Sequence, residues 1–223
     1  MDNLTFTVTI SGTIIIAISF IWGLNIHFKN KRPVYLKSFY LIPLVGLIAS
    51  LNTISFRILE YYEKPTGFII QYILFPIDLI MWALFFDKIF FKSIEKLAIK
   101  ILTGLTILIC GVLLSQMTSI SASLHIHGLC NVTKTIFCIN YFFRLFKDPP
   151  TNDIKNESSF WIVAGLLFFA SFSLPIYSLN DYITRNFSYQ VSASIFAISN
   201  IMIIIMYLFF LKAYLCQTRP HKE

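Results

Sequence analysis

Charged residues are scarce in this chain of 223 residues, of which 13% are Asp, Glu, Lys or Arg. Soluble domains average about 25%. Hydrophobic residues make up 57% of the sequence, and no stretch is both long and polar enough to form a separate soluble domain. This composition excludes an ordinary soluble protein. It predicts an all-α, polytopic membrane protein whose immediate surroundings are the lipid bilayer.

Sequence motifs for chemistry are also missing. The chain has no nucleophile elbow, phosphate-binding loop, HExxH pair or dinucleotide fingerprint. Its four cysteines are Cys110, Cys130, Cys138 and Cys216, and none has the CxxC spacing of a metal site. The net charge of +7 is not gathered on a soluble fold, so nucleic-acid binding is not expected. We therefore predict no enzyme activity, no metal and no cofactor.

Long apolar segments are what the sequence has in abundance. Crossing the hydrocarbon core takes about 20 mostly apolar residues in a helix. Segments of about this length recur seven times, and we expect them to form one transmembrane domain over residues 1–223. The predicted helices are 4–28, 38–59, 68–86, 97–116, 120–143, 159–177 and 189–215.

Basic residues alternate between the two sides of the predicted membrane. Fourteen of the 18 lysines and arginines fall on one side, three fall on the other, and Lys134 lies within a span. Cytoplasmic loops carry the excess of Lys and Arg. The N-terminus is therefore predicted outside and the C-terminus in the cytoplasm. The alternation holds only if segment 120–143, which carries Lys134, also crosses.

A lysine at mid-depth of a membrane helix needs a partner, because exposing it to lipid costs about 2.5–3.5 kcal/mol on insertion scales. Lys134 shares a helical face with His127 and Asn131. Asp78 lies at a matching depth in segment 68–86, so an Asp78–Lys134 pair is expected. The pair has a functional interpretation, as a proton relay, ion site or ligand-sensitive switch, and a structural one, as a fixed register contact. Lys134 reaching the interface or another polar group is a further alternative.

Polar residues also gather at the predicted outer ends of the helices. Arg57 and Glu60 share a face with Ser50 and Thr53, and Gln71 shares a face with Asp78. Such a cluster either receives a small ligand or consists of solvated helix ends. The candidate ligand-binding or switch residues are Asp78, Lys134, Arg57, Glu60, Gln71, His127 and Asn131.

The segment SSFWIVAGLLFFASFSL at 158–174 carries a pattern made by Phe160, Trp161, Ile162, Gly165, Leu166 and Leu167. It resembles a pattern in small uncharacterised seven-helix membrane proteins of Bacteroidota, some of which are encoded beside sensor histidine kinases. Phe169 stands where those proteins often have tyrosine. The resemblance implies a multi-pass protein of the bacterial inner (cytoplasmic) membrane with a part in signalling.

The favoured prediction is a sensory or accessory membrane module that acts with a sensor histidine kinase or another membrane signalling protein. The alternative is a small-solute or ion transporter that uses Asp78 and Lys134 as its midplane site. A membrane enzyme comes third.

Overall fold

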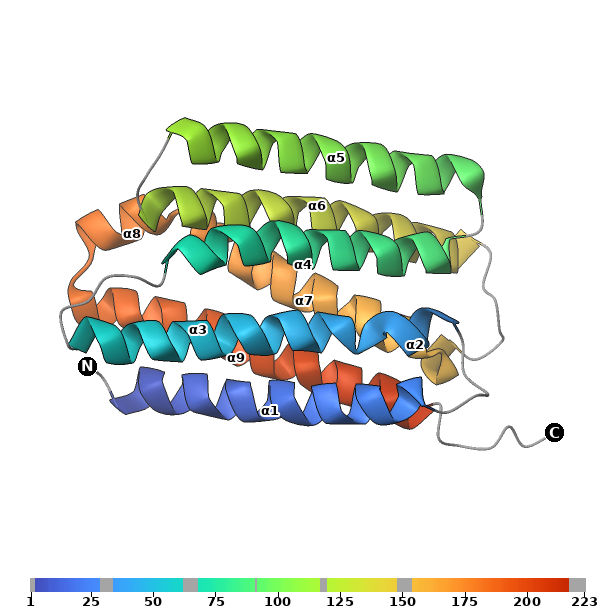
Figure 1. Cartoon of the computed structure of the whole chain (residues 1–223), viewed down its shortest axis with the longest axis horizontal. Coiled ribbons are helices and arrows are strands. Elements are labelled where there is room, and N and C mark those ends of the chain that lie inside the picture. Colours follow the sequence, from blue (N-terminus) through green and yellow to red (C-terminus); the bar gives the residue numbers. More distant parts are fainter. Residues whose placement is uncertain are drawn as a thin grey trace.

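The computed structural model describes residues 3–28, 34–61, 68–90, 92–116, 120–147 and 154–216. These residues are helical almost throughout, and no strand occurs among them, as predicted. Consecutive long helices run in opposite directions along the molecule (Figure 1). The long helices of the described part are α1 (Asn3–His27), α3 (Leu41–Tyr61), α4 (Phe68–Ile89), α5 (Ser93–Gln116), α6 (Ile120–Lys147), α7 (Ser158–Ser178) and α9 (Tyr189–Cys216). They correspond to the seven predicted helices, with ends shifted by a few residues.

Short helices lie between some of the long ones: α2 (Val34–Phe39), η1 (Ile154–Asn156) and α8 (Asn180–Asn186). The predicted helix 38–59 is wrong at its start, because the chain turns at Tyr40 and α3 begins afterwards. Pro43 is the third residue of α3. Proline is tolerated in the first helical turn, where a backbone N–H has no partner inside the helix. The proline therefore marks a helix start here.

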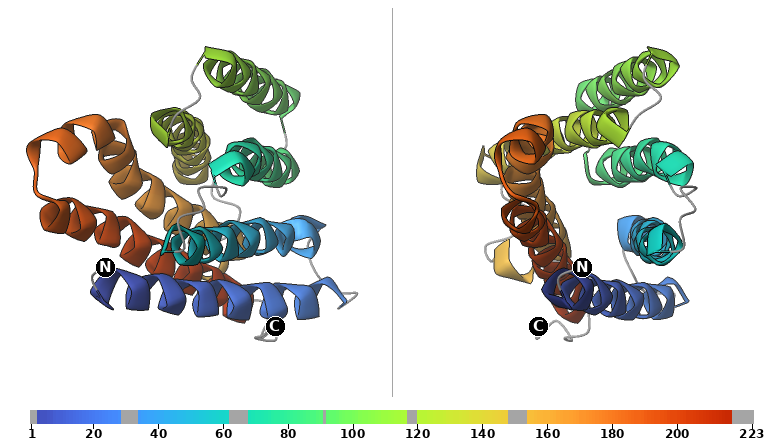
Figure 2. Two further views of the ribbon diagram at one scale, coloured as in Figure 1. Left: turned by 60° about the vertical axis from the view of Figure 1, so that its left-hand side comes forward. Right: turned by 90° about the vertical axis from the view of Figure 1, so that its left-hand side faces the viewer.

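Six of the long helices form a closed ring. Each packs on the next in the order α1, α3, α4, α6, α7 and α9, and α9 packs back on α1. The seventh, α5, packs against α4 and α6 and lies outside the ring (Figure 2). Helices that are far apart in the sequence, such as α1 and α9, are thereby neighbours.

The two ends of the bundle differ in charge. One end, which we call the basic end, is where α1, α4, α6 and α9 stop and where α5 and α7 start (Figure 1). We call the opposite end the far end. At the far end the described part of the chain carries Arg185, in α8. The described cationic side chains towards the basic end are Lys88, Lys92, Lys96, Lys100, Arg144, Lys147, Lys155 and Lys212.

Tyr35, in α2, also lies towards the basic end. Its burial, followed by the charge of Glu157, raises its pKa well above the ordinary value, so its hydroxyl stays protonated at neutral pH.

The outer surface of the bundle is apolar. In α5, Leu97, Ile101, Leu105 and Leu108 are each more than half exposed and recur at helical spacing. Soluble monomers rarely expose apolar patches larger than a few hundred Å². Four helical segments of the described part are long and apolar enough to cross a membrane: Phe6–His27, Ser93–Ser115, Ser158–Ser178 and Gln190–Cys216. These observations indicate a helical membrane protein.

The helices α3, α4 and α6 are not among these four segments, and the described apolar part of α3, Leu41–Ser55, is shorter than they are. In α6 the physical reason is clear, because Lys134, Asn131 and His127 lower its hydropathy. Lys134 and Asn131 are 3% and 0% exposed, and His127 is largely buried. These three polar side chains of α6 are therefore directed into the protein rather than towards its apolar outer surface.

An aromatic layer crosses the ring between its middle and the basic end. We use this name for Phe39, Trp82, Phe85, Phe210 and Tyr214, all at most 3% exposed. Ring centroids are 5.0 Å apart for Phe39 and Phe210 and 5.9 Å apart for Trp82 and Phe210. These edge-to-face and tilted contacts between α2, α4 and α9 fill the ring at this level.

Candidate functional site

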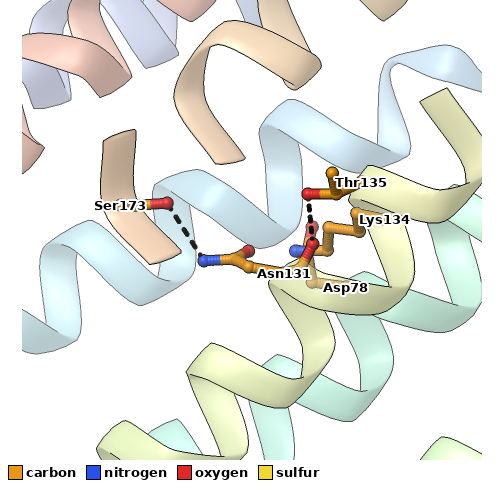
Figure 3. Close-up of polar contacts among 5 residues, drawn as sticks. All are labelled: Asp78, Asn131, Lys134, Thr135 and Ser173. Carbon is orange, nitrogen blue, oxygen red and sulfur yellow. Dashed lines mark hydrogen bonds and ion pairs between the residues drawn. The ribbon is translucent and has the colours of Figure 1, made fainter. Parts of the chain in front are cut away.

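The centre of the candidate site is an ion pair between α4 and α6. The Nζ atom of Lys134 donates to Oδ2 of Asp78 (Figure 3). The lysine side chain is 4% exposed and the aspartate side chain 23% exposed. Both residues lie about midway along their helices, so the matching depth predicted from the sequence is confirmed as a contact. Pairing is required here, because an isolated charge among apolar helices is strongly unfavourable.

Polar contacts continue along the same face of α6. The side-chain amide of Asn131, which is 0% exposed, donates to Ser173 Oγ of α7 at 3.1 Å (Figure 3). One turn later Thr135 donates to the Asn131 carbonyl oxygen at 2.8 Å. The face of α6 therefore joins α4 through Lys134 and α7 through Asn131.

His127 lies one turn before Asn131 on this face. Its ring packs between Phe75 and Tyr177, with centroid distances of 4.5 and 4.2 Å. The Nε2 atom of His127 and the Oδ1 atom of Asn131 are buried, and neither has a hydrogen-bond partner among the described residues. Buried polar atoms are normally satisfied. This face of α6 is therefore only partly satisfied by protein groups.

A cavity of about 350 Å³ lies inside the ring beside the ion pair. This volume is in the range of roughly 300–1,000 Å³ typical of small-molecule pockets. Asp78, Lys134 and His127 line it, together with residues from all six ring helices. Most of the remaining lining is aliphatic or aromatic. The site is therefore an apolar chamber with one charged wall.

The cavity also has a second polar surface, which we call the polar wall. It consists of Thr9, Ser50, Thr53 and Asn200, from α1, α3 and α9. Asn200 Nδ2 is 3.4 Å from Thr9 Oγ1, and Ser50 Oγ is hydrogen-bonded to Thr13 Oγ1. In the ring, α1 lies opposite α6 and α9 lies opposite α4, while α3 is the neighbour of α4. The cavity therefore has polar groups on several of its helices in an otherwise apolar lining.

The cavity extends towards the far end on one side and to the aromatic layer on the other. Tyr177, the last residue but one of α7, lines it towards the far end. Trp82 and Tyr207 line its deeper part, and Phe85 and Phe210 follow three residues later towards the basic end. Gly46 leaves room for the Tyr207 hydroxyl, which a Cβ atom at that position would overlap. The chamber therefore ends against packed aromatic rings.

Four of the seven predicted site residues are brought together. Asp78, Lys134 and His127 line the cavity, and Asn131 lies on the same face of α6. The side chains of Arg57, Glu60 and Gln71 lie outside the described residues. Among the described residues no group of three or more His, Cys, Asp or Glu side chains is placed to hold a metal ion.

The sequence reasoning missed several residues that line the cavity, among them Thr9, Gly46, Tyr177 and Tyr207. Thr9, Gly12 and Ile16 of α1 do recur at helical spacing and share a face. That pattern is common in packed helices, so only the ring arrangement distinguishes a cavity lining from a helix contact.

No protein-family model matches the chain, and comparisons with curated proteins and with solved structures also find no match.

Proposed function

We propose that this chain is a sensory or accessory module of the bacterial inner membrane, with seven spans, its N-terminus outside and its C-terminus in the cytoplasm. In this proposal a small polar molecule enters the cavity from the far end, which faces outwards. The bound molecule shifts the helices of the ring. The basic end then presents a changed surface to a partner signalling protein, a sensor histidine kinase in the first instance.

The observation that carries the proposal is the cavity itself, with an ion pair in its wall and the aromatic layer beyond it. A chamber that ends against buried rings favours holding a ligand over conducting one. Several contacts around it cross between helices, so a ligand that changes them acts on α4, α6 and α7 together. Signalling requires that the ligand bind two arrangements with different affinity.

The charge asymmetry supports the orientation and the side on which a partner binds. Lys and Arg gather at the basic end, as the cytoplasmic side of a membrane protein requires. The resemblance of 158–174 to proteins encoded beside sensor kinases supports the class of partner.

The test is affinity capture of the tagged chain from its native membrane in mild detergent, with bound proteins identified by mass spectrometry. We expect a histidine kinase, and we expect the Lys92→Gln/Lys147→Gln variant to lose it. Both lysines are exposed at the basic end. Arg185→Gln, at the far end, is the matched control and should retain the kinase. Retention by the first variant and loss by the control would contradict the proposal.

One observation favours a second function, a transporter of small solutes or ions. The Asp78–Lys134 pair lies near the middle of the bundle, where transporters place their substrate and ion sites. In proteoliposomes a transporter would accumulate a specific solute, and Asp78→Asn would abolish the uptake. Uptake of that kind without kinase capture would replace the sensory proposal by this one.

A further inference from the structure

We propose that the cavity binds a zwitterion of the α-amino-acid type, whose carboxylate is held by Lys134 and whose ammonium group is held by Asp78. The inference rests on the ligand-binding role of the cavity in the proposed function and names the chemical class of the ligand.

The hydrogen-bonding capacity of Lys134 is the first support. An ammonium group has three N–H donors. Asp78 Oδ2 is the one acceptor that the described residues offer to Lys134 Nζ. Lys134 also lines the cavity. A ligand carboxylate supplies two further acceptor oxygens at this position, and charge-assisted bonds of this kind are the strong ones.

The exposure of Asp78 is the second support. A carboxylate accepts at two oxygens and about four lone-pair positions. Lys134 uses Oδ2, while 23% of the aspartate side chain remains exposed and the residue lines the cavity. A ligand ammonium group therefore finds an acceptor next to the donors of Lys134. The charged wall therefore places a carboxylate and an ammonium group side by side, and each can bind the oppositely charged group of a zwitterion.

Electrical neutrality decides between ligand classes. With Asp78 and Lys134 paired, the charged wall has no net charge. A bound monocation or monoanion leaves the site with one uncompensated charge in surroundings of low dielectric, which is costly. A zwitterion adds one charge of each sign and keeps the site neutral. The charge pattern therefore selects against simple amines and simple acids.

The rest of the cavity accommodates a side group. Beyond the ion pair the lining is apolar, with Leu74, Phe169 and Ile203, and the polar wall supplies hydroxyl groups and an amide. A volume of about 350 Å³ gives room for a ligand of amino-acid size with its side chain. Apolar contact of this kind adds to the affinity. The charged groups alone provide less, because they must lose their own hydration when the ligand binds.

The experiment uses the full chain in nanodiscs and measures thermal unfolding with each of the standard α-amino acids. Every amino acid that raises the unfolding temperature is then compared by calorimetry with two analogues of the same side chain. These are the decarboxylated amine and the deaminated acid, for example isopentylamine and 4-methylpentanoate for leucine. We expect at least one amino acid to bind, and its amine and acid to bind at least about tenfold more weakly.

The double variant Asp78→Asn/Lys134→Met should bind that amino acid at least about tenfold more weakly. Thr103→Val, in α5 outside the ring, leaves the cavity lining and both charges in place and should bind that amino acid as the unaltered chain does. Absence of a shift with every amino acid, or equal binding of a matching amine or acid, would overturn the inference. These comparisons are made on the unaltered chain, so they stand even if the double variant does not fold.

Failure of the inference and failure of the proposed function give different results. Kinase capture without amino-acid binding would contradict the zwitterion as the ligand class and would leave the proposed sensory role in place. Amino-acid binding without kinase capture leaves the site and removes the partner, and uptake of the same amino acid into proteoliposomes then identifies a transporter.

Discussion

Lys134 shows how a single charge constrains its neighbours. It is 3% exposed and is compensated by Asp78 on the next helix of the ring. Such a pair adds little to the free energy of unfolding, because both groups lose their hydration when they are buried. Removing one partner, however, leaves the other as a buried charge without compensation, which is strongly destabilising. The two residues should therefore be strongly coupled in stability.

Lys134→Met is expected to lower the free energy of unfolding by about 3–5 kcal/mol, the usual cost of breaking a buried pair. The double variant Lys134→Met/Asp78→Asn should recover most of this loss, because no uncompensated charge remains. Unfolding in mixed micelles measures both. If the losses of the two single variants simply add in the double variant, Asp78 and Lys134 do not interact as the structure has them.

Two threonines of α5 provide a second test with a matched control. Thr106 Oγ1 is 2.8 Å from Thr133 Oγ1 of α6, and both are buried. Thr103 is also buried, but its hydroxyl has no hydrogen-bond partner among the described residues. Valine replaces the hydroxyl by a methyl group of similar size. Its effect therefore depends on what the hydroxyl was bonded to.

We expect Thr106→Val to destabilise the protein by about 0.6 kcal/mol, the average for hydrogen bonds between membrane helices, and by no more than about 1.7 kcal/mol. Thr103→Val should be neutral or slightly stabilising, because it removes a buried, unpaired hydroxyl. Thermal unfolding of the two variants in the same detergent makes the comparison. Equal losses would mean that the α5–α6 hydrogen bond contributes nothing specific.

At the scale of elements, α7 and α9 approach each other closely at Gly165. A Cβ atom on Gly165 would lie 2.7 Å from Phe209 Cβ and 3.1 Å from the Met206 carbonyl oxygen. The second of these is a backbone atom, so relief requires α9 to move as a whole. Small residues at such positions allow membrane helices to approach closely.

Gly165→Ala is therefore expected to cost about 1–3 kcal/mol of stability, as overpacked sites do. Gly104→Ala in α5 is the control, because a Cβ atom there meets nothing within 4 Å. The control should gain stability by up to about 1 kcal/mol, since alanine is the better helix former. Unfolding midpoints of the two variants are compared. A Gly165→Ala protein as stable as the control would contradict the close α7–α9 contact.

At the scale of the whole molecule, the charge difference between the two ends predicts how the bundle sits in a bilayer. Ser188, between α8 and α9 at the far end, and Lys92, before α5 at the basic end, are both exposed. With the native cysteines replaced by alanine, an impermeant maleimide added to intact cells should label Ser188→Cys and leave Lys92→Cys unlabelled. Permeabilised cells provide the control in which both react. Labelling of Lys92→Cys alone would invert the orientation.

Particular elements show how far sequence reasoning reached. Helical spacing identified the inward face of α6, and counting residues from the helix start gave the depth of Asp78; the structure has both as expected. The same reasoning placed a helix start at 38, where the chain turns at Tyr40. It also gave no sign that α5 lies outside the ring, because a membrane helix outside the ring and a helix within it have nearly the same composition.

The sequence by itself determined the long helices, their approximate limits and the accumulation of positive charge towards one end. These depend on hydrophobicity and on the helical repeat, which are local properties of the chain. Only the tertiary structure decided which helices became neighbours, and so brought Asp78 to Lys134 and left a cavity beside them. The physical reason is that α1 meets α9, and α4 meets α6, through contacts between residues far apart in the chain, whose geometry no local pattern specifies.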